Sequence, residues 1–129
     1  MTFKRLLLID DNDDYTTLVE FFLQQDTDWE IIIALNGKEG IAEARQKQPD
    51  LILLDIVMPN LDGISVYKIL KSQRATSSIP IIFLTAMMGV EEMVRSQVNA
   101  DVEVITKPMD LTVLKNLISD LYNRYLALT

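Results

Sequence analysis

Five short apolar runs, each followed by a longer amphipathic stretch, constrain the fold of this chain more than any other feature of its sequence. The runs cover residues 6–9, 31–33, 51–54, 81–84 and 102–105. Short apolar runs of this kind are typical of strands that are buried on both faces, and such strands occur in parallel sheets covered by helices. The alternation therefore predicts an α/β protein in which strands and helices take turns along the chain.

The stretches between the runs carry helical periodicity. Tyr15, Leu18, Val19 and Phe22, for example, lie at i, i+3, i+4 and i+7 and predict one face of a helix. The pattern as a whole predicts a (βα)5 doubly wound, five-stranded parallel sheet in the order 2-1-3-4-5. A length of 129 residues leaves room for one domain, 1–129, without an output domain. The chain would be either a stand-alone protein or a domain cut from a larger chain, and we expect the first because Met1 begins it.

Composition narrows the chemistry. The chain has no cysteine and no histidine, which excludes disulfides, thiolate and imidazole metal sites, and a histidine base. Its net charge is −7 and its sequence pI is about 4.5, which argues against a nucleic-acid surface. No apolar run approaches the roughly 20 residues that a membrane span needs, and the N-terminus does not read as a signal peptide. We therefore expect a cytoplasmic protein that does not contact a membrane.

Polar residues stand where the predicted strands end. Asp10 and Asp11 follow the first run, Asp55 the third and Thr85 the fourth, and Lys107 comes shortly after the fifth. In a doubly wound sheet, ligands bind outside the carboxyl ends of the strands, at the point where the strand order reverses. That point lies between strands one and three. We therefore expect the three aspartates to converge there, with the threonine and the lysine on the adjoining strands.

Three converging carboxylates repel one another unless a cation lies between them. A site that offers only oxygen ligands suits a hard ion, and Mg²⁺ fits best. Lys107 and Thr85 add the positive charge and the hydroxyl donor that a phosphoryl group needs. The set predicts Mg²⁺-assisted phosphoryl transfer to a carboxylate nucleophile.

Five segments carry a resemblance to a known family: LLIDD (7–11), LLDIVMP (53–59), DG (62–63), FLTA (83–86) and TKP (106–108). In this order and at these strand ends, they resemble the receiver domain of bacterial two-component response regulators, which has a flavodoxin-like fold. The resemblance covers roughly Lys4 to Tyr122. Each motif is weak alone, but the combination is highly specific.

The resemblance implies a role for each acidic residue of the set. Asp55 is the expected phosphoacceptor and would form an acyl phosphate. Asp11 is expected to bind Mg²⁺ directly, Asp10 directly or through water, and Asp55 and the backbone carbonyl of Val57 complete the ligands from the protein. The chain would then be a phosphoacceptor switch in a two-component phosphorelay, with no enzymatic activity beyond accepting and losing its own phosphoryl group.

The resemblance also implies contacts and partners. Thr85 and Lys107 are expected to contact the phosphoryl oxygens, and Lys107–Pro108 matches a peptide bond that is commonly cis in the family. The donor would be a phosphohistidine on a histidine kinase or a histidine phosphotransfer protein. Output to a downstream protein target is expected through the fourth helix, fifth strand and fifth helix, a face also available for homodimerisation. The sequence names neither the kinase, the stimulus nor the target.

Local structure offers alternative interpretations of single residues. Asp10 and Asp11 could cap the first helix, although Asp13 or Asp14 could do so instead. Asp62–Gly63 is better explained as a turn and helix start than as chemistry. Asp55, in contrast, would be costly to bury unpaired after four aliphatic residues, which favours a functional role.

Other functions fit these residues less well than the receiver. A calcium loop from Asp10 fails because Tyr15 and Phe21 stand where glycine and an acid are needed. A flavodoxin would not place two carboxylates in its phosphate loop. An Mg²⁺-dependent aspartyl-phosphate phosphatase could use Asp11 and Asp13, but leaves Asp55 unexplained. A receiver-like scaffold that binds partners without being phosphorylated remains an alternative.

Three apolar residues bear on signal output and lifetime. Receivers often carry an aromatic residue where this chain has Val104, so we expect the signal to leave through movement of residues 85–90, without an aromatic switch. Val57 and Met87 lie two residues beyond the acceptor aspartate and the fourth-strand threonine. Because neither side chain can orient a water molecule, we expect slow self-dephosphorylation.

Overall fold

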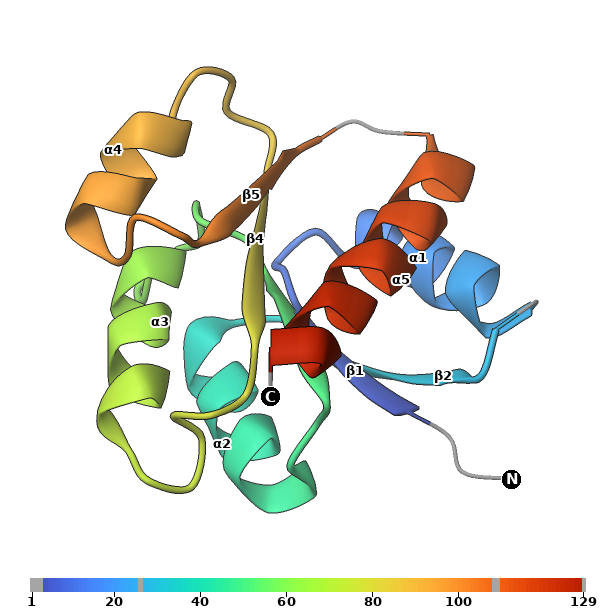
Figure 1. Ribbon diagram of the computed structural model, residues 1–129, viewed down its shortest axis with the longest axis horizontal. Coiled ribbons are helices and arrows are strands. Elements are labelled where there is room, and N and C mark those ends of the chain that lie inside the picture. Colours follow the sequence, from blue (N-terminus) through green and yellow to red (C-terminus); the bar gives the residue numbers. More distant parts are fainter. Residues whose placement is uncertain (1–3, 26, 108–109, 129) are drawn as a thin grey trace.

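A five-stranded parallel sheet with helices on both faces forms the protein (Figure 1). The computed structural model describes residues 4–25, 27–107 and 110–128. The strands are β1 (Lys4–Ile9), β2 (Trp29–Ala34), β3 (Leu51–Leu54), β4 (Ile81–Thr85) and β5 (Glu103–Thr106). The helices are α1 (Asp13–Gln25), α2 (Gly37–Lys47), α3 (Gly63–Ser72), α4 (Glu91–Gln97) and α5 (Leu111–Leu128). Their alternation and the sheet order β2-β1-β3-β4-β5 confirm the predicted doubly wound fold.

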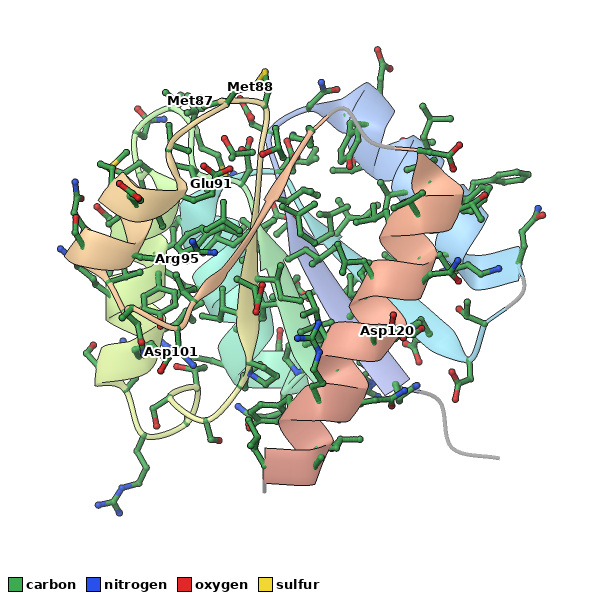
Figure 2. All side chains as sticks on the ribbon, turned by 45° about the horizontal axis from the view of Figure 1, so that its top comes forward. Met87, Met88, Glu91, Arg95, Asp101 and Asp120 are labelled. Atoms are coloured by element: carbon green, nitrogen blue, oxygen red, sulfur yellow. The ribbon has the colours of Figure 1, made fainter. Side chains whose placement is uncertain are left out.

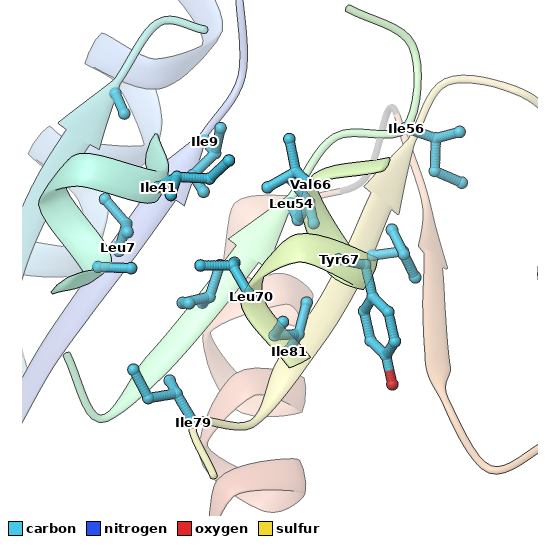
Figure 3. Packing of buried hydrophobic residues seen from close by; sticks show 14 of the residues in the cluster. Leu7, Ile9, Ile41, Leu54, Ile56, Val66, Tyr67, Leu70, Ile79 and Ile81 are labelled. Carbon is cyan, nitrogen blue, oxygen red and sulfur yellow. The ribbon is translucent and has the colours of Figure 1, made fainter. Parts of the chain in front are cut away.

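The two faces of the sheet have separate apolar cores. Leu7 and Ile9 of β1 point toward α2, α3 and α4, and Figure 3 shows them in the cluster that includes Ile41 of α2. Leu6 and Leu8 point the opposite way, into a second cluster under α1 and α5. All four β1 residues are fully buried, and each contributes about 1.5–3 kcal/mol of burial free energy. These cores fix where the polar carboxyl ends of β1 and β3 lie.

The predicted apolar face of α1 is confirmed for Val19, which is fully buried, and for Tyr15, which packs against the core, but it is wrong for Leu18. The structure buries Thr16, Val19 and Leu23, whereas Leu18 is 58% exposed. The helix carries more apolar residues than one face can bury, so periodicity alone could not select the buried ones. Thr16 can be buried because its hydroxyl donates a hydrogen bond to the Asp13 carbonyl, 2.9 Å away.

The start of α3 is pressed against the end of β3. Asp62 caps the helix by accepting a hydrogen bond from the Ser65 N–H (2.9 Å), which confirms the predicted helix start. Gly63 donates its N–H to the Ile56 carbonyl (2.8 Å), and a Cβ at this position would lie 2.0 Å from the Asp55 carbonyl oxygen. Only glycine permits this approach, which holds the segment after β3 close to the helix.

None of the helices in the described residues is both long and apolar enough to span a bilayer.

Candidate functional site

Three aspartates meet at the carboxyl ends of β1 and β3. Asp10, Asp11 and Asp55 each place a carboxylate oxygen within 4.8 Å of the others. Asp10 is fully buried, Asp55 is 6% exposed, and Asp11 is exposed. The structure thus brings together the three acids that the strand order predicted would converge.

Backbone hydrogen bonds fix the two buried acids. The Asp10 N–H donates to the Ala34 carbonyl (3.1 Å), and the Asp55 N–H donates to the Ile9 carbonyl (2.9 Å), so each acid extends the sheet ladder by one residue. One Asp10 oxygen also accepts the Asn12 N–H at 3.0 Å. The acids therefore stand on the rigid sheet, which preorganises them for binding.

Asn12 caps α1, although the predicted candidates for this role were Asp10, Asp11, Asp13 and Asp14. Its Oδ1 accepts the Tyr15 N–H at 3.0 Å. Asp13 and Asp14 instead occupy the first turn, where negative charge is favourable. Because asparagine does the capping, Asp10 and Asp11 are left for the acid cluster.

Lys107 is the cation nearest to the acids among the described residues. Its Nζ lies 2.6 Å from Asp10 Oδ2 and 3.9 Å from Asp55 Oδ2, and its side chain is only 10% exposed. The backbone N–H of Lys107 donates to the Thr85 carbonyl, which ties the end of β5 to β4. The Thr85 side chain is fully buried, and its hydroxyl oxygen accepts the Met87 N–H at 3.1 Å.

One lysine cannot balance three carboxylates. The pKa of Asp55 is raised from 3.8 to about 6, mainly by burial and then by the charge of Asp10, while Lys107 and the Val57 N–H act to lower it. The site is therefore short of positive charge. Oxygen donors arranged in this way, two of them buried, fit a hard divalent cation such as Mg²⁺.

A cavity of about 290 Å³ opens beside the acids. It contains all the residues that the sequence assigned to the site, including Val57, whose backbone carbonyl was a predicted ligand. The lining residues are Asp10, Asp11, Asn12, Asp55, Val57, Thr85, Ala86, Met87 and Lys107. The cavity thus brings three carboxylates, a hydroxyl and an ammonium around one space.

Tyr15 is a site residue that the sequence interpretation placed only in the apolar stripe of a helix. The Nζ of Lys107 lies 4.5 Å from its ring centroid. The pKa of Tyr15 is raised to about 12, mainly by burial and also by the charges of Asp10 and Asp55. The sequence could have indicated that Tyr15 lies near the site, because Tyr15 comes only four residues after Asp11, in the first turn of the helix that follows β1.

Two further predicted features concern the β5 side. Val104 is half-buried and packs against the α2–α4 cluster, opposite Phe83 of β4. The prediction that signal output needs no aromatic switch at this position stays a prediction. The predicted cis bond at Lys107–Pro108 lies outside the described residues.

A doubly wound sheet with buried acids and a lysine at its switch point fits a domain that accepts a phosphoryl group on a carboxylate. The family model of the response regulator receiver domain matches residues 6–119, and the chain belongs to this family. It is a phosphoacceptor switch of two-component signal transduction.

Named relatives support the assignment. The DNA-binding dual master transcriptional regulator RpaA of Synechocystis is 34% identical over 107 residues, which cover 83% of this chain and 44% of RpaA. The alkaline phosphatase synthesis transcriptional regulatory protein PhoP of Bacillus subtilis is 35% identical over 106 residues, 81% of this chain and 42% of PhoP. The chain thus spans less than half the length of these curated relatives.

The solved receiver domain of the Francisella response regulator 1452 has the same fold. It superposes with a TM-score of 0.80 at 27% identity, over 94% of this chain and 98% of that domain.

Proposed function

We propose that Asp55 is the phosphoacceptor and that Asp10, Asp11, Asp55 and the carbonyl of Val57 hold Mg²⁺. The observation that carries the proposal is the buried Asp55 carboxylate, which shares a 4.8 Å cluster with two other acids and has the Lys107 ammonium 3.9 Å away. The excess of negative charge in this cluster favours a divalent ion.

The residues would act on a phosphohistidine donor. An oxygen of Asp55 attacks phosphorus, a new O–P bond forms, the P–N bond breaks, and its electron pair returns to the imidazole. The Lys107 ammonium lies 2.6 Å from Asp10 and 3.9 Å from Asp55, and it would turn from Asp10 to pair with a phosphoryl oxygen. The Thr85 oxygen accepts a bond from a backbone N–H, so its own proton is free to be donated to the phosphoryl group. Bound Mg²⁺ would neutralise charge on the carboxylates and the phosphoryl oxygens.

The proposal extends to partners. Receivers of this family act between histidine kinases and downstream targets; here the donor would be a histidine kinase or a histidine phosphotransfer protein. Output would use the face of α4, β5 and α5, by contact with a target or a second copy. The net charge of −7 fits a protein partner better than nucleic acid. A cytoplasmic location is part of the same proposal.

Contacts between α4 and residues 102–106, which include β5, support this output route. The Thr106 hydroxyl donates to Glu91 at 3.3 Å, and the Arg95 guanidinium donates to the Val102 carbonyl at 3.1 Å. Glu91 and Arg95 both lie on α4 (Figure 2). Movement of residues 85–90 would therefore be passed to this face. Structures with and without a phosphoryl mimic test the route, and an unmoved 85–90 loop would count against it.

Intact-mass measurement tests the acceptor. The protein is incubated with Mg²⁺ and phosphoramidate, and the wild type is expected to gain one phosphoryl group that Asp55→Asn does not gain. Asp120→Asn, an exposed change on α5, is the matched control and should be phosphorylated as the wild type is. A wild type that gains no mass would favour the phosphorylation-independent scaffold. Multiple turnovers of an aryl phosphate would favour the phosphatase.

A further inference from the structure

Tyr15 is a residue of the site that the proposed transfer does not use. Its ring packs against the apolar cluster under α1 and α5, but its hydroxyl oxygen is buried and finds no hydrogen-bond partner among the described residues. Packing explains the ring and leaves the hydroxyl unexplained. A phenylalanine would fill the same space without burying an unpaired polar group.

The ring also contacts the catalytic lysine. The Lys107 ammonium lies 4.5 Å from the Tyr15 ring centroid and 2.6 Å from Asp10 Oδ2. A lysine side chain has four flexible bonds and would otherwise sample many positions. Because the apolar cluster holds the ring, the cation–π contact limits where the ammonium can go.

The hydroxyl has a natural partner in a second state of the site. When Lys107 turns from Asp10 toward a phosphoryl group on Asp55, one buried Asp10 oxygen loses its hydrogen bond. The Tyr15 hydroxyl is a buried donor without a partner among the described residues, and after burial the charge of Asp10 contributes most to raising its pKa. It can therefore donate to the oxygen that the lysine releases.

We infer that Tyr15 is a positioning residue for phosphoryl acceptance: its ring holds the Lys107 ammonium over the acids, and its hydroxyl replaces that ammonium on Asp10 after transfer. The inference rests on the proposed role of Asp55. It assigns two separable functions to one side chain, the first before transfer and the second after it.

Two substitutions separate the functions. Tyr15→Leu removes ring and hydroxyl, whereas Tyr15→Phe removes only the hydroxyl. Phe22→Leu is the matched control, because Phe22 lies on the same helix with the Lys115 ammonium 6.0 Å from its ring centroid. The measurements are the rate of mass gain from phosphoramidate with Mg²⁺, and the affinity for beryllofluoride with Mg²⁺ by calorimetry.

The ring function predicts the rates. Tyr15→Leu should accept the phosphoryl group about 10-fold more slowly, which is within the range of a desolvated cation–π contact. Tyr15→Phe should restore a rate close to wild type, and Phe22→Leu should not change it. Wild-type acceptance by a folded Tyr15→Leu protein would overturn this function. If circular dichroism shows that the leucine variant is unfolded, Tyr15→Met provides the second ring-free protein.

The hydroxyl function predicts the affinities. Tyr15→Phe should bind beryllofluoride about 3-fold more weakly than the wild type, as expected for one lost hydrogen bond. Equal affinities would overturn this function. Failure of the inference is distinguishable from failure of the proposed function: in the first case the wild type is phosphorylated and the variants match it, and in the second the wild type gains no phosphoryl group.

Discussion

Two loops at the carboxyl edge of the sheet differ in how closely they are packed. The acid edge, where β1 and β3 end, contains the fully buried Asp10 and the contact of Gly63 with the backbone of Asp55. The β4–α4 loop, residues 86–90, is open. Met88 lies at the outer end of this loop (Figure 2) and is 85% exposed. A Cβ at Gly89 would meet no atom within 4 Å.

The difference indicates that the acid edge serves binding and that the β4–α4 loop serves the response to binding. The acid edge stores electrostatic repulsion in a rigid frame, which prepares it for a cation and a phosphoryl group. The β4–α4 loop has few contacts to lose, so it can move at low cost. Thr85 lies at the junction, with its buried side chain in the rigid part and its hydroxyl oxygen bound to the loop through the Met87 N–H.

Alanine substitutions at two glycines should show the largest difference in stability loss between the two regions. Gly63→Ala places a Cβ 2.0 Å from the Asp55 carbonyl oxygen, so we expect a loss of about 3 kcal/mol in the free energy of unfolding, with slower phosphoryl acceptance. Gly89→Ala meets open space, and only its positive φ of 74° should cost stability, about 1 kcal/mol. Urea unfolding measures both; equal losses would contradict the contrast.

Neutralising Asp55 should stabilise the metal-free protein. Its pKa is raised from 3.8 to about 6 in the folded state, so its contribution to stability is full below 3.8 and is lost as pH rises through about 6. At about pH 7, in the presence of a metal chelator, the free energy of unfolding of Asp55→Asn should therefore exceed that of the wild type by about 2 kcal/mol. This difference should become smaller as the pH is lowered toward about 4. Urea titrations at several pH values test this.

The exposed Asp120→Asn is the control for this pH series, and should stay within about 0.5 kcal/mol of the wild type. Saturating Mg²⁺ should reduce the advantage of Asp55→Asn, because the ion removes the repulsion that the substitution relieves. An Asp55→Asn protein no more stable than the wild type at neutral pH would show that the acid edge carries no stored repulsion.

The sheet order and the meeting of the acids could be predicted because they follow from rules that act along the whole chain. Five apolar runs require a covered parallel sheet, and its switch point lies between β1 and β3. Asp10, Asp11 and Asp55 could then be placed together without any knowledge of side-chain packing. The structure brings them within 4.8 Å.

Choices between neighbouring residues could not be predicted in this way. Asn12, and not Asp13 or Asp14, caps α1, because the geometry of the chain leaving β1 decides which side chain reaches the free N–H groups. Lys107 lies closer to Asp10 than to Asp55, and the position of Tyr15 under Lys107 depends on the rotation of α1 about its axis. Periodicity placed Tyr15 on the inward face of α1, but it could not show that the ring lies under Lys107.

The smallest expected effect concerns the lifetime of the phosphorylated state, where the two loops meet. Val57 and Met87 line the cavity and are 57% and 45% exposed, so water can reach Asp55, but neither side chain can orient it. Met87→Asn should speed phosphate loss about 10-fold, equivalent to about 1.4 kcal/mol of barrier, by positioning the attacking water. Met88→Asn is the matched control, since Met88 is more exposed and does not line the cavity. Mass spectrometry after removal of the phosphodonor measures both rates. If the Met88 variant loses phosphate as fast as the Met87 variant, then the polarity or mobility of the loop, and not an oriented water molecule, determines the lifetime of the phosphorylated state.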